Sequence, residues 1–307
     1  MSTTNTLDQF RGCLLGLSLG DALGAPYEGG ILEKLLWRAI GTTRDGMMRW
    51  TDDTQMTVDL IESYLAGGHF DSDDLAARFA KSYRWSRGYG PGTAKMLKRI
   101  AKGVDWRKAN LSVYPDGSFG NGAAMRAPIL GLIFASRMED LTKAARLTAT
   151  VTHAHPIGIE GAILLAAVTG LAARGCSQVE IFEQASASCN LEEFKSKLAA
   201  AQSWLESERS VSTADVASRL GRGIAAHDSC ITAVYLALRF RNQPFLDMQR
   251  FIAKIGGDAD TIGAMAGAIW GTINGAAGLP AEPLSKLEQR ERLTSLADAL
   301  HQHVTKV

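Results

Sequence analysis

The sequence predicts an all-α protein that folds as a single multi-helix bundle over residues 1–307. Apolar residues recur at intervals of three and four along most of the chain, which is the spacing of one helix face. We find no stretch of five or more residues with the strict alternation of a half-buried strand. The segments between periodic stretches are short, and no Pro- or Ser-rich linker divides the chain. We therefore expect one domain.

The first predicted helix starts after Thr6. Thr6 and Gln9 have the spacing of a capping box, in which the first residue precedes the helix and the second lies in its first turn. It carries a glycine at every fourth position, and a second such stripe lies in the uncharged segment 261–279; the two stripes are Gly12, Gly16, Gly20, Gly24 and Gly263, Gly267, Gly271, Gly275. Residues four apart share one helix face, and each glycine costs up to ~1 kcal/mol relative to alanine. Paired stripes are typical of backbones in close contact, so we expect helices from about residues 7 and 261 to cross.

The same periodicity predicts the remaining helices. They cover residues 55–66, 73–85, 92–101, 125–135, 141–152, 158–173, 177–186, 191–207, 213–220, 229–239, 245–254 and 284–303.

The composition excludes several classes of protein. The chain has 33 Lys+Arg against 32 Asp+Glu and 46% hydrophobic residues, which argues against disorder and against broad binding of nucleic acid. Its four cysteines form no C-x-x-C pair and predict neither a zinc site nor a disulfide framework. No secretory signal begins the sequence. The segment 261–279 is nearly long enough to span a membrane, but Gly, Ala and Thr dominate it, which favours a buried helix. We expect a cytoplasmic monomer without a membrane span.

Two acidic blocks stand directly before predicted helices. The first holds Thr51, Asp52 and Asp53, and the second holds Asp258, Asp260 and Thr261. One interpretation is helix capping, in which Asp or Thr satisfies free backbone N–H groups. Each block, however, has more carboxylates than a cap needs. Four carboxylates in one place would repel one another unless divalent cations neutralise them, and oxygen-only ligands select Mg²⁺, Mn²⁺ or Ca²⁺. Only the matched glycine stripes suggest that the two blocks meet.

Three loops offer further candidate residues. Residues 87–93 contain three glycines before a predicted helix, a pattern that exposes backbone N–H groups to a phosphate; a plain tight turn is the alternative. Residues 117–126 place Phe119 between glycines, where its ring can stack on a base or be buried in a surface loop. His153 and His155 lie two apart and do not share a helix face, so we expect at least one of them to be structural.

These blocks together resemble the ADP-ribosylglycohydrolases, a group related to the dinitrogenase-reductase-activating glycohydrolase. The resemblance runs from about residue 10 to about residue 280. It is carried by GLSLGDALGAPYE at 16–28, TDDT at 51–54, SFGNGAAMR at 118–126, THA at 152–154 and GGDADTIG at 256–263. The resemblance implies an orthogonal bundle of helices with a cleft that holds two Mg²⁺ or Mn²⁺ ions.

The resemblance also assigns roles to individual positions. Thr51, Asp52 and Asp53 match one group of metal ligands. Asp258, Asp260 and Thr261 match the other, with Asp260 bridging the two ions. Glu28 matches a glutamate on a mobile loop that reaches the metals. The substrate-binding positions that match are Gly90, Gly92, Ser118, Phe119, Asn121 and His153.

The implied reaction is hydrolysis of the bond between ADP-ribose and an acceptor on a protein or a small molecule. We expect Asp53 or Glu28 to handle the proton and Asp260 to support catalysis through the metals. The acceptor expected first is arginine, with serine or an acetyl ester as alternatives. The loop 87–93, the SFGN block and His153 resemble the serine-type branch more closely, although Phe119 and Ala123 depart from it. A magnesium-dependent nucleotide phosphohydrolase and a non-catalytic ADP-ribose binder are rival interpretations.

Overall fold

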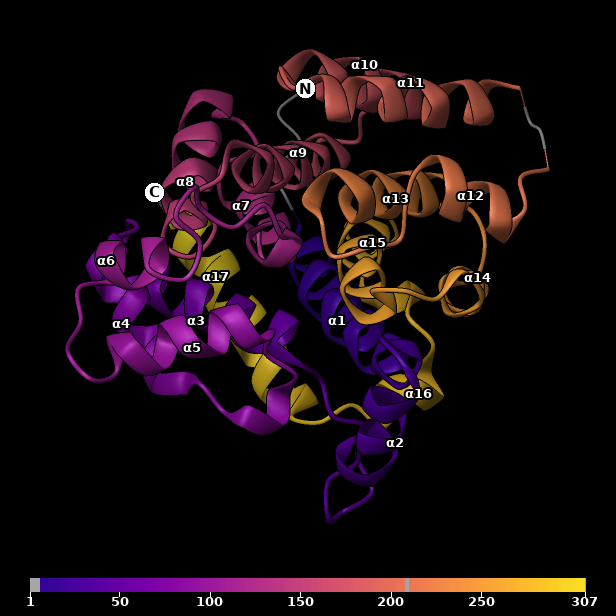
Figure 1. Ribbon diagram of the computed structural model, residues 1–307. Coiled ribbons are helices and arrows are strands. Elements are labelled where there is room, and N and C mark those ends of the chain that lie inside the picture. Colours follow the sequence, from indigo (N-terminus) through magenta and orange to yellow (C-terminus); the bar gives the residue numbers. More distant parts are fainter. Residues whose placement is uncertain (1–5, 208–209, 307) are drawn as a thin grey trace.

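The computed structural model describes residues 6–207 and 210–306. Within these residues it holds α-helices and short 3₁₀ turns but no β-strand, which confirms the all-α prediction (Figure 1). The α-helices are α1 (Leu7–Gly24), α2 (Ile31–Ile40), α3 (Asp52–Gly67), α4 (Ser72–Ser82), α5 (Pro91–Ile100), α6 (Trp106–Leu111), α7 (Pro128–Ile133), α8 (Met138–Thr150), α9 (Pro156–Ala173), α10 (Gln178–Ser188), α11 (Glu192–Glu206), α12 (Thr213–Arg219), α13 (Ala226–Arg239), α14 (Phe245–Ile255), α15 (Ala259–Asn274), α16 (Ala281–Ser285) and α17 (Arg290–Lys306).

Helices α1 and α15 cross at the centre of the molecule, as the glycine stripes predicted (Figure 1). Their backbones touch so closely that a Cβ on Gly12, Gly16 or Gly20 would lie 2.1, 2.3 or 2.1 Å from a carbonyl oxygen of the facing glycine on α15. The two helices run antiparallel, since the start of α1 faces the end of α15. The C-terminal end of α1 therefore lies beside the N-terminal end of α15.

Some helix boundaries differ from the prediction. The predicted helix 284–303 is divided into α16 and α17, because Gln289 between them has φ +56°, outside the right-handed helical region. Helix α15 ends at Asn274, because Gly275 adopts φ +72°. Helices α2 and α6 were not predicted. Helix α6 has only six residues, too few to display a period, and α2 turns three of its apolar residues, Ile31, Leu35 and Leu36, to solvent.

Helix α9 is surrounded by α7, α8, α10, α13 and α15 in the core. Among the described residues it is the one helix that is long and apolar enough to cross a membrane, with a mean hydropathy of 1.7. The protein itself buries 83% of that window, as expected for a central core helix. Helix α15, at 16 residues, is shorter than such a span.

Candidate active site

A buried carboxylate at the end of α1 fixes the start of α3. Asp21 accepts hydrogen bonds from the backbone N–H of Thr51 at 2.9 Å and of Thr54 at 3.1 Å, and from the Thr54 hydroxyl at 2.6 Å. Burial raises the pKa of Asp21 to about 6, although these donors act against the rise. Asp21 was not among the predicted site residues. The signal for it was a carboxylate placed inside an apolar, glycine-rich helix.

The two acidic blocks meet, which the sequence left open. Carboxylate oxygens of Glu28, Asp258 and Asp260 all lie within 4.8 Å of one another. Asp52 joins them from the start of α3, where burial and then the negative charge of Glu28 raise its pKa. The convergence follows from the fold, because the α1–α15 crossing and the Asp21 contacts bring the N-terminal ends of α3 and α15 together. We call Glu28, Asp52, Asp258 and Asp260 the acidic cluster.

The acidic cluster has little positive charge to balance it. Burial, together with the charge of Glu28, raises the pKa of Asp52 and Asp260 well above the usual range. Burial and the charge of Asp21 do the same for Asp53. None of the described residues that line the surrounding pocket is a lysine or an arginine. Such a site favours either protonated carboxyl groups or bound cations.

Thr51 and Asp53 lie behind the pocket rather than in its lining. The Thr51 hydroxyl donates to Asp53 Oδ2 at 2.9 Å and accepts from the Asp53 N–H at 3.3 Å, so Thr51 is a true cap of α3. The Thr261 hydroxyl approaches the same carboxylate oxygen at 3.4 Å. Asp53 Oδ1 is buried and has no hydrogen-bond partner among the described residues. The capping interpretation therefore holds for Thr51 and leaves one buried carboxylate oxygen of Asp53 unsatisfied.

Asp258 occupies the cap position of α15 but does not cap it. Its carboxylate instead accepts a hydrogen bond from the Asn121 side-chain amide, which also donates to Ser229 Oγ at 2.8 Å. Capping is therefore the wrong interpretation for Asp258. Asn121, predicted as a substrate-binding residue, lies in the pocket lining and orients a carboxylate of the acidic cluster.

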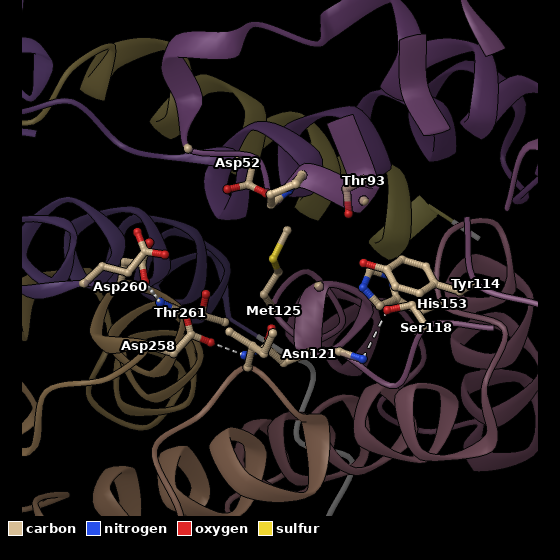
Figure 2. A pocket seen from close by; sticks show the side chains of 18 residues that line it. Asp52, Thr93, Tyr114, Ser118, Asn121, Met125, His153, Asp258, Asp260 and Thr261 are labelled. Carbon is tan, nitrogen blue, oxygen red and sulfur yellow. Dashed lines mark hydrogen bonds between the residues drawn. The ribbon is translucent and has the colours of Figure 1, made fainter. Parts of the chain in front are cut away.

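The pocket extends from the acidic cluster to a neutral end. Figure 2 shows Asp258, Asp260 and Thr261 at one end, Thr93, Tyr114, Ser118 and His153 at the other, and Met125 between them. The lining residues are Glu28, Asp52, Gly88, Gly90, Pro91, Gly92, Thr93, Tyr114, Ser118, Gly120, Asn121, Gly122, Met125, His153, Ile224, Asp258, Asp260 and Thr261. The sequence did not single out Tyr114 or Ile224, which come from segments without a recognisable motif, and it gave Met125 no role although this residue lies in the SFGNGAAMR block.

Two glycines shape the neutral end: Gly90 borders open space, and Gly92 leaves room for the Tyr114 ring. Gly90 precedes Pro91 at the N-terminus of α5, and a Cβ there would meet nothing within 4 Å. A Cβ on Gly92 would lie 2.1 Å from the Tyr114 hydroxyl oxygen. The start of α5 thus presents free backbone N–H groups beside open space, an arrangement that suits a phosphate.

The two candidate histidines have different places. His153 is buried with its ring against Gly120 and Gly122, and its Nδ1 lies 2.7 Å from the Thr152 hydroxyl. Burial lowers the pKa of His153 to about 3, so the ring is neutral near pH 7. His155 caps α9 through Ile157 N–H, which makes it the structural histidine of the pair. Phe119 is half-exposed, lies next to His155 and does not line the pocket.

The loop of residues 222–224 holds two residues of the site, Asp258 and Asn121. The Arg222 carbonyl accepts from Asp258 N–H, and the Ile224 carbonyl accepts from Asn121 N–H, each at 2.9 Å. The Arg222 side chain donates to the Ile255 carbonyl at 2.7 Å and so ties the loop to the end of α14. Residues 222–224 therefore set the positions of Asp258 and Asn121, a role that no local pattern in the sequence signals.

Comparison with known proteins agrees with this geometry. The model of the ADP-ribosylglycohydrolase family matches residues 2–307. The ADP-ribosylhydrolase ARH3 of Mus musculus is 35% identical over 98% of this chain and 93% of its own length. The ADP-ribosylarginine hydrolase Tri1 of Pseudomonas putida is 25% identical over 100% of this chain and 81% of its own. A solved structure described as an ADP-ribosylglycohydrolase-related protein complex superposes with a TM-score of 0.74, at 27% identity and 97% and 98% coverage.

Proposed function

The chain belongs to the ADP-ribosylglycohydrolase family and is an ADP-ribosylhydrolase, and from this premise we propose that it cleaves the O-glycosidic bond between ADP-ribose and a serine side chain. The observation that carries the proposal is the charge distribution of the pocket. All four carboxylates that line it belong to the acidic cluster, and no described lining residue is basic.

This distribution argues against arginine, the acceptor that the sequence favoured first. Recognition of a guanidinium group typically uses a carboxylate that receives two parallel N–H donors. Divalent cations bound at the acidic cluster would occupy its carboxylates and leave none in the described lining for an arginine. A serine hydroxyl needs no such partner. The relative with arginine in its name is also less similar, at 25% identity, than the ARH3 protein at 35%.

The residues fit two hard divalent cations such as Mg²⁺ or Mn²⁺. The donors are all oxygen atoms, and one of them, the buried Asp53 Oδ1, has no hydrogen-bond partner among the described residues. The residues that would hold the ions are Thr51, Asp52, Asp53, Asp258, Asp260 and Thr261, with Glu28 beside them. When bound, such ions supply positive charge that polarises ribose hydroxyls and water.

The protein's own groups supply the remaining steps. The backbone N–H groups at the start of α5 hold the diphosphate, and neutral His153 offers its free ring nitrogen to the ligand. Asn121 orients Asp258 toward the distal ribose. Glu28 lies in the pocket lining, whereas Asp53 does not. We therefore assign proton transfer from the attacking water to Glu28 rather than to Asp53.

The test is release of ADP-ribose from two conjugates, one linked to serine and one to arginine, in Mg²⁺, in Mn²⁺ and in chelator. We expect chelator-sensitive release of free ADP-ribose from the serine conjugate. Release of AMP would instead indicate a phosphohydrolase. Glu28→Gln should lower kcat by roughly 100-fold or more, whereas Glu193→Gln on the exposed face of α11 should not. Faster release from the arginine conjugate would refute the acceptor assignment.

A further inference from the structure

An exposed apolar patch lies next to the acidic cluster. Four large apolar side chains are exposed between residues 27 and 36: Tyr27 at 48%, Ile31 at 79%, Leu35 at 52% and Leu36 at 51%. We call these four residues the α2 patch. Single exposed apolar residues are ordinary on protein surfaces, but a group of them marks an interaction site.

Two residues of the α2 patch lie on the side of α2 that faces solvent, opposite the buried side of the helix. Ile31 and Leu35 are one helical turn apart and share one face of α2. Trp37, on the opposite face of this helix, is 9% exposed and packs against Gly41. Helix α2 thus buries the side that carries Trp37 and turns Ile31 and Leu35 to solvent, and Figure 1 shows the helix projecting from one end of the molecule.

The position of Glu28 indicates what covers the α2 patch. Glu28 lines the acidic end of the pocket, and the next three residues along the chain, Gly29, Gly30 and Ile31, are exposed. The acidic end therefore opens to solvent at the segment that leads into α2. In the proposed function the bond that breaks lies at this end, so the acceptor must leave the pocket beside Glu28.

We propose that the α2 patch docks apolar residues of the ADP-ribosylated protein, next to its modified side chain. The proposal rests on the proposed function, because that function puts the acceptor at the Glu28 end. The pocket then recognises ADP-ribose, and the α2 patch distinguishes a protein acceptor from a small one. Docking should lower KM for modified proteins and leave the chemical step unchanged.

The experiment compares one linkage on two acceptors: an ADP-ribosyltransferase that has modified itself, and a tripeptide carrying the linkage that the wild-type enzyme cleaves. In the double variant Ile31→Gln/Leu35→Gln we expect KM for the modified protein to rise roughly tenfold. We expect kcat for both substrates, and KM for the tripeptide, to stay as in the wild type. Val179→Gln is the matched control, because Val179 is 51% exposed on α10, on the far side of the molecule from α2 (Figure 1).

Three results would overturn the proposal. An unchanged KM for the modified protein would show that the α2 patch does not contact the acceptor. An equal rise in KM for both substrates would indicate a lid over the pocket. A wild-type dimer that the double variant converts to monomers, measured by light scattering, would identify a second copy as the occupant. If the wild type releases ADP-ribose from neither the serine nor the arginine conjugate, the proposed function itself fails and this inference falls with it.

Discussion

Gly16→Ala should destabilise the protein, even though alanine is the better helix former. The added Cβ would lie 2.3 Å from the Gly267 carbonyl oxygen, whereas an ordinary contact starts at 3.4 Å. The atom in the way belongs to the backbone, so α1 and α15 must separate by roughly 1 Å. Overpacking of this kind costs about 1–3 kcal/mol, and the gain in helix propensity is at most about 1 kcal/mol. With a central cost of about 2 kcal/mol and this offset, we expect a net loss of about 1 kcal/mol.

The assay is urea unfolding followed by circular dichroism, with Gly67→Ala as the control. Gly67 lies in the last turn of α3, and its Cβ would meet only the His69 ring, at 3.5 Å. Alanine should therefore be neutral or stabilising at Gly67. Activity should fall in Gly16→Ala, because separation of the helices moves Asp21 away from Asp260. A Gly16→Ala variant as stable as Gly67→Ala would refute the argument from backbone contact.

Three further predictions concern the site and a neighbouring carboxylate. Asp260→Asn should raise the melting temperature in chelator, because burial and the charge of Glu28 oppose ionisation of Asp260. The variant should also lose the rise in melting temperature that we expect Mn²⁺ to give the wild type. An equal Mn²⁺ response of the two proteins, measured by scanning fluorimetry, would contradict this. Arg222→Ala should lower kcat roughly tenfold through loss of the hydrogen bond to the Ile255 carbonyl. The same variant should bind Mn²⁺ more weakly in calorimetry, and Arg222→Lys should recover part of the kcat. Burial raises the pKa of Asp59 to about 7, above its unfolded value of 3.8. The folded state then holds more protons between these values, so wild-type stability falls as pH rises from about 4 to 7. In Asp59→Asn the free energy of unfolding should lack that decline, so the variant should become more stable relative to the wild type between pH 5 and pH 8 in urea titrations. A variant that instead becomes less stable relative to the wild type would show that ionisation of the buried carboxyl costs no stability.

The sequence predicted those parts of the fold that depend on local or periodic patterns. Glycines four apart identified the α1–α15 crossing, because only a close backbone contact accounts for two such stripes. The two acidic blocks were found because each has more carboxylates than a helix cap uses. The capping interpretation then proved right for Thr51 and wrong for Asp258, which makes no capping hydrogen bond. The Asp258 carboxylate instead accepts from Asn121, which lies 137 positions away, and no local pattern reveals a partner so distant.

The parts that were missed depend on long-range contacts. The Asp21 carboxylate holds backbone N–H groups of α3, and Arg222 holds Asp258 through its carbonyl and the end of α14 through its side chain. Each partner lies about 30 positions or more away along the chain, so no local pattern signals these roles. Phe119 has the sequence context for stacking on a base; its ring lies next to His155 and not in the pocket lining, so its role in substrate binding stays a prediction. Such outcomes depend on how segments pack, and one sequence does not encode them in any short pattern.

The fold itself produces the charge imbalance at the site. Antiparallel packing of α1 on α15 and the hold of Asp21 on α3 bring two helix N-termini together, and each contributes roughly half a positive charge. Together they offset about one carboxylate. The acidic cluster and Asp53 bring five, which leaves an excess of negative charge in a buried pocket without a basic side chain in its described lining. Protonation removes the excess but also removes the ligands that the chemistry needs. Divalent cations bound as in the proposed function would remove the excess and keep the ligands. We therefore expect the stability of this protein to respond to Mn²⁺ more strongly than to any change of pH between 6 and 8.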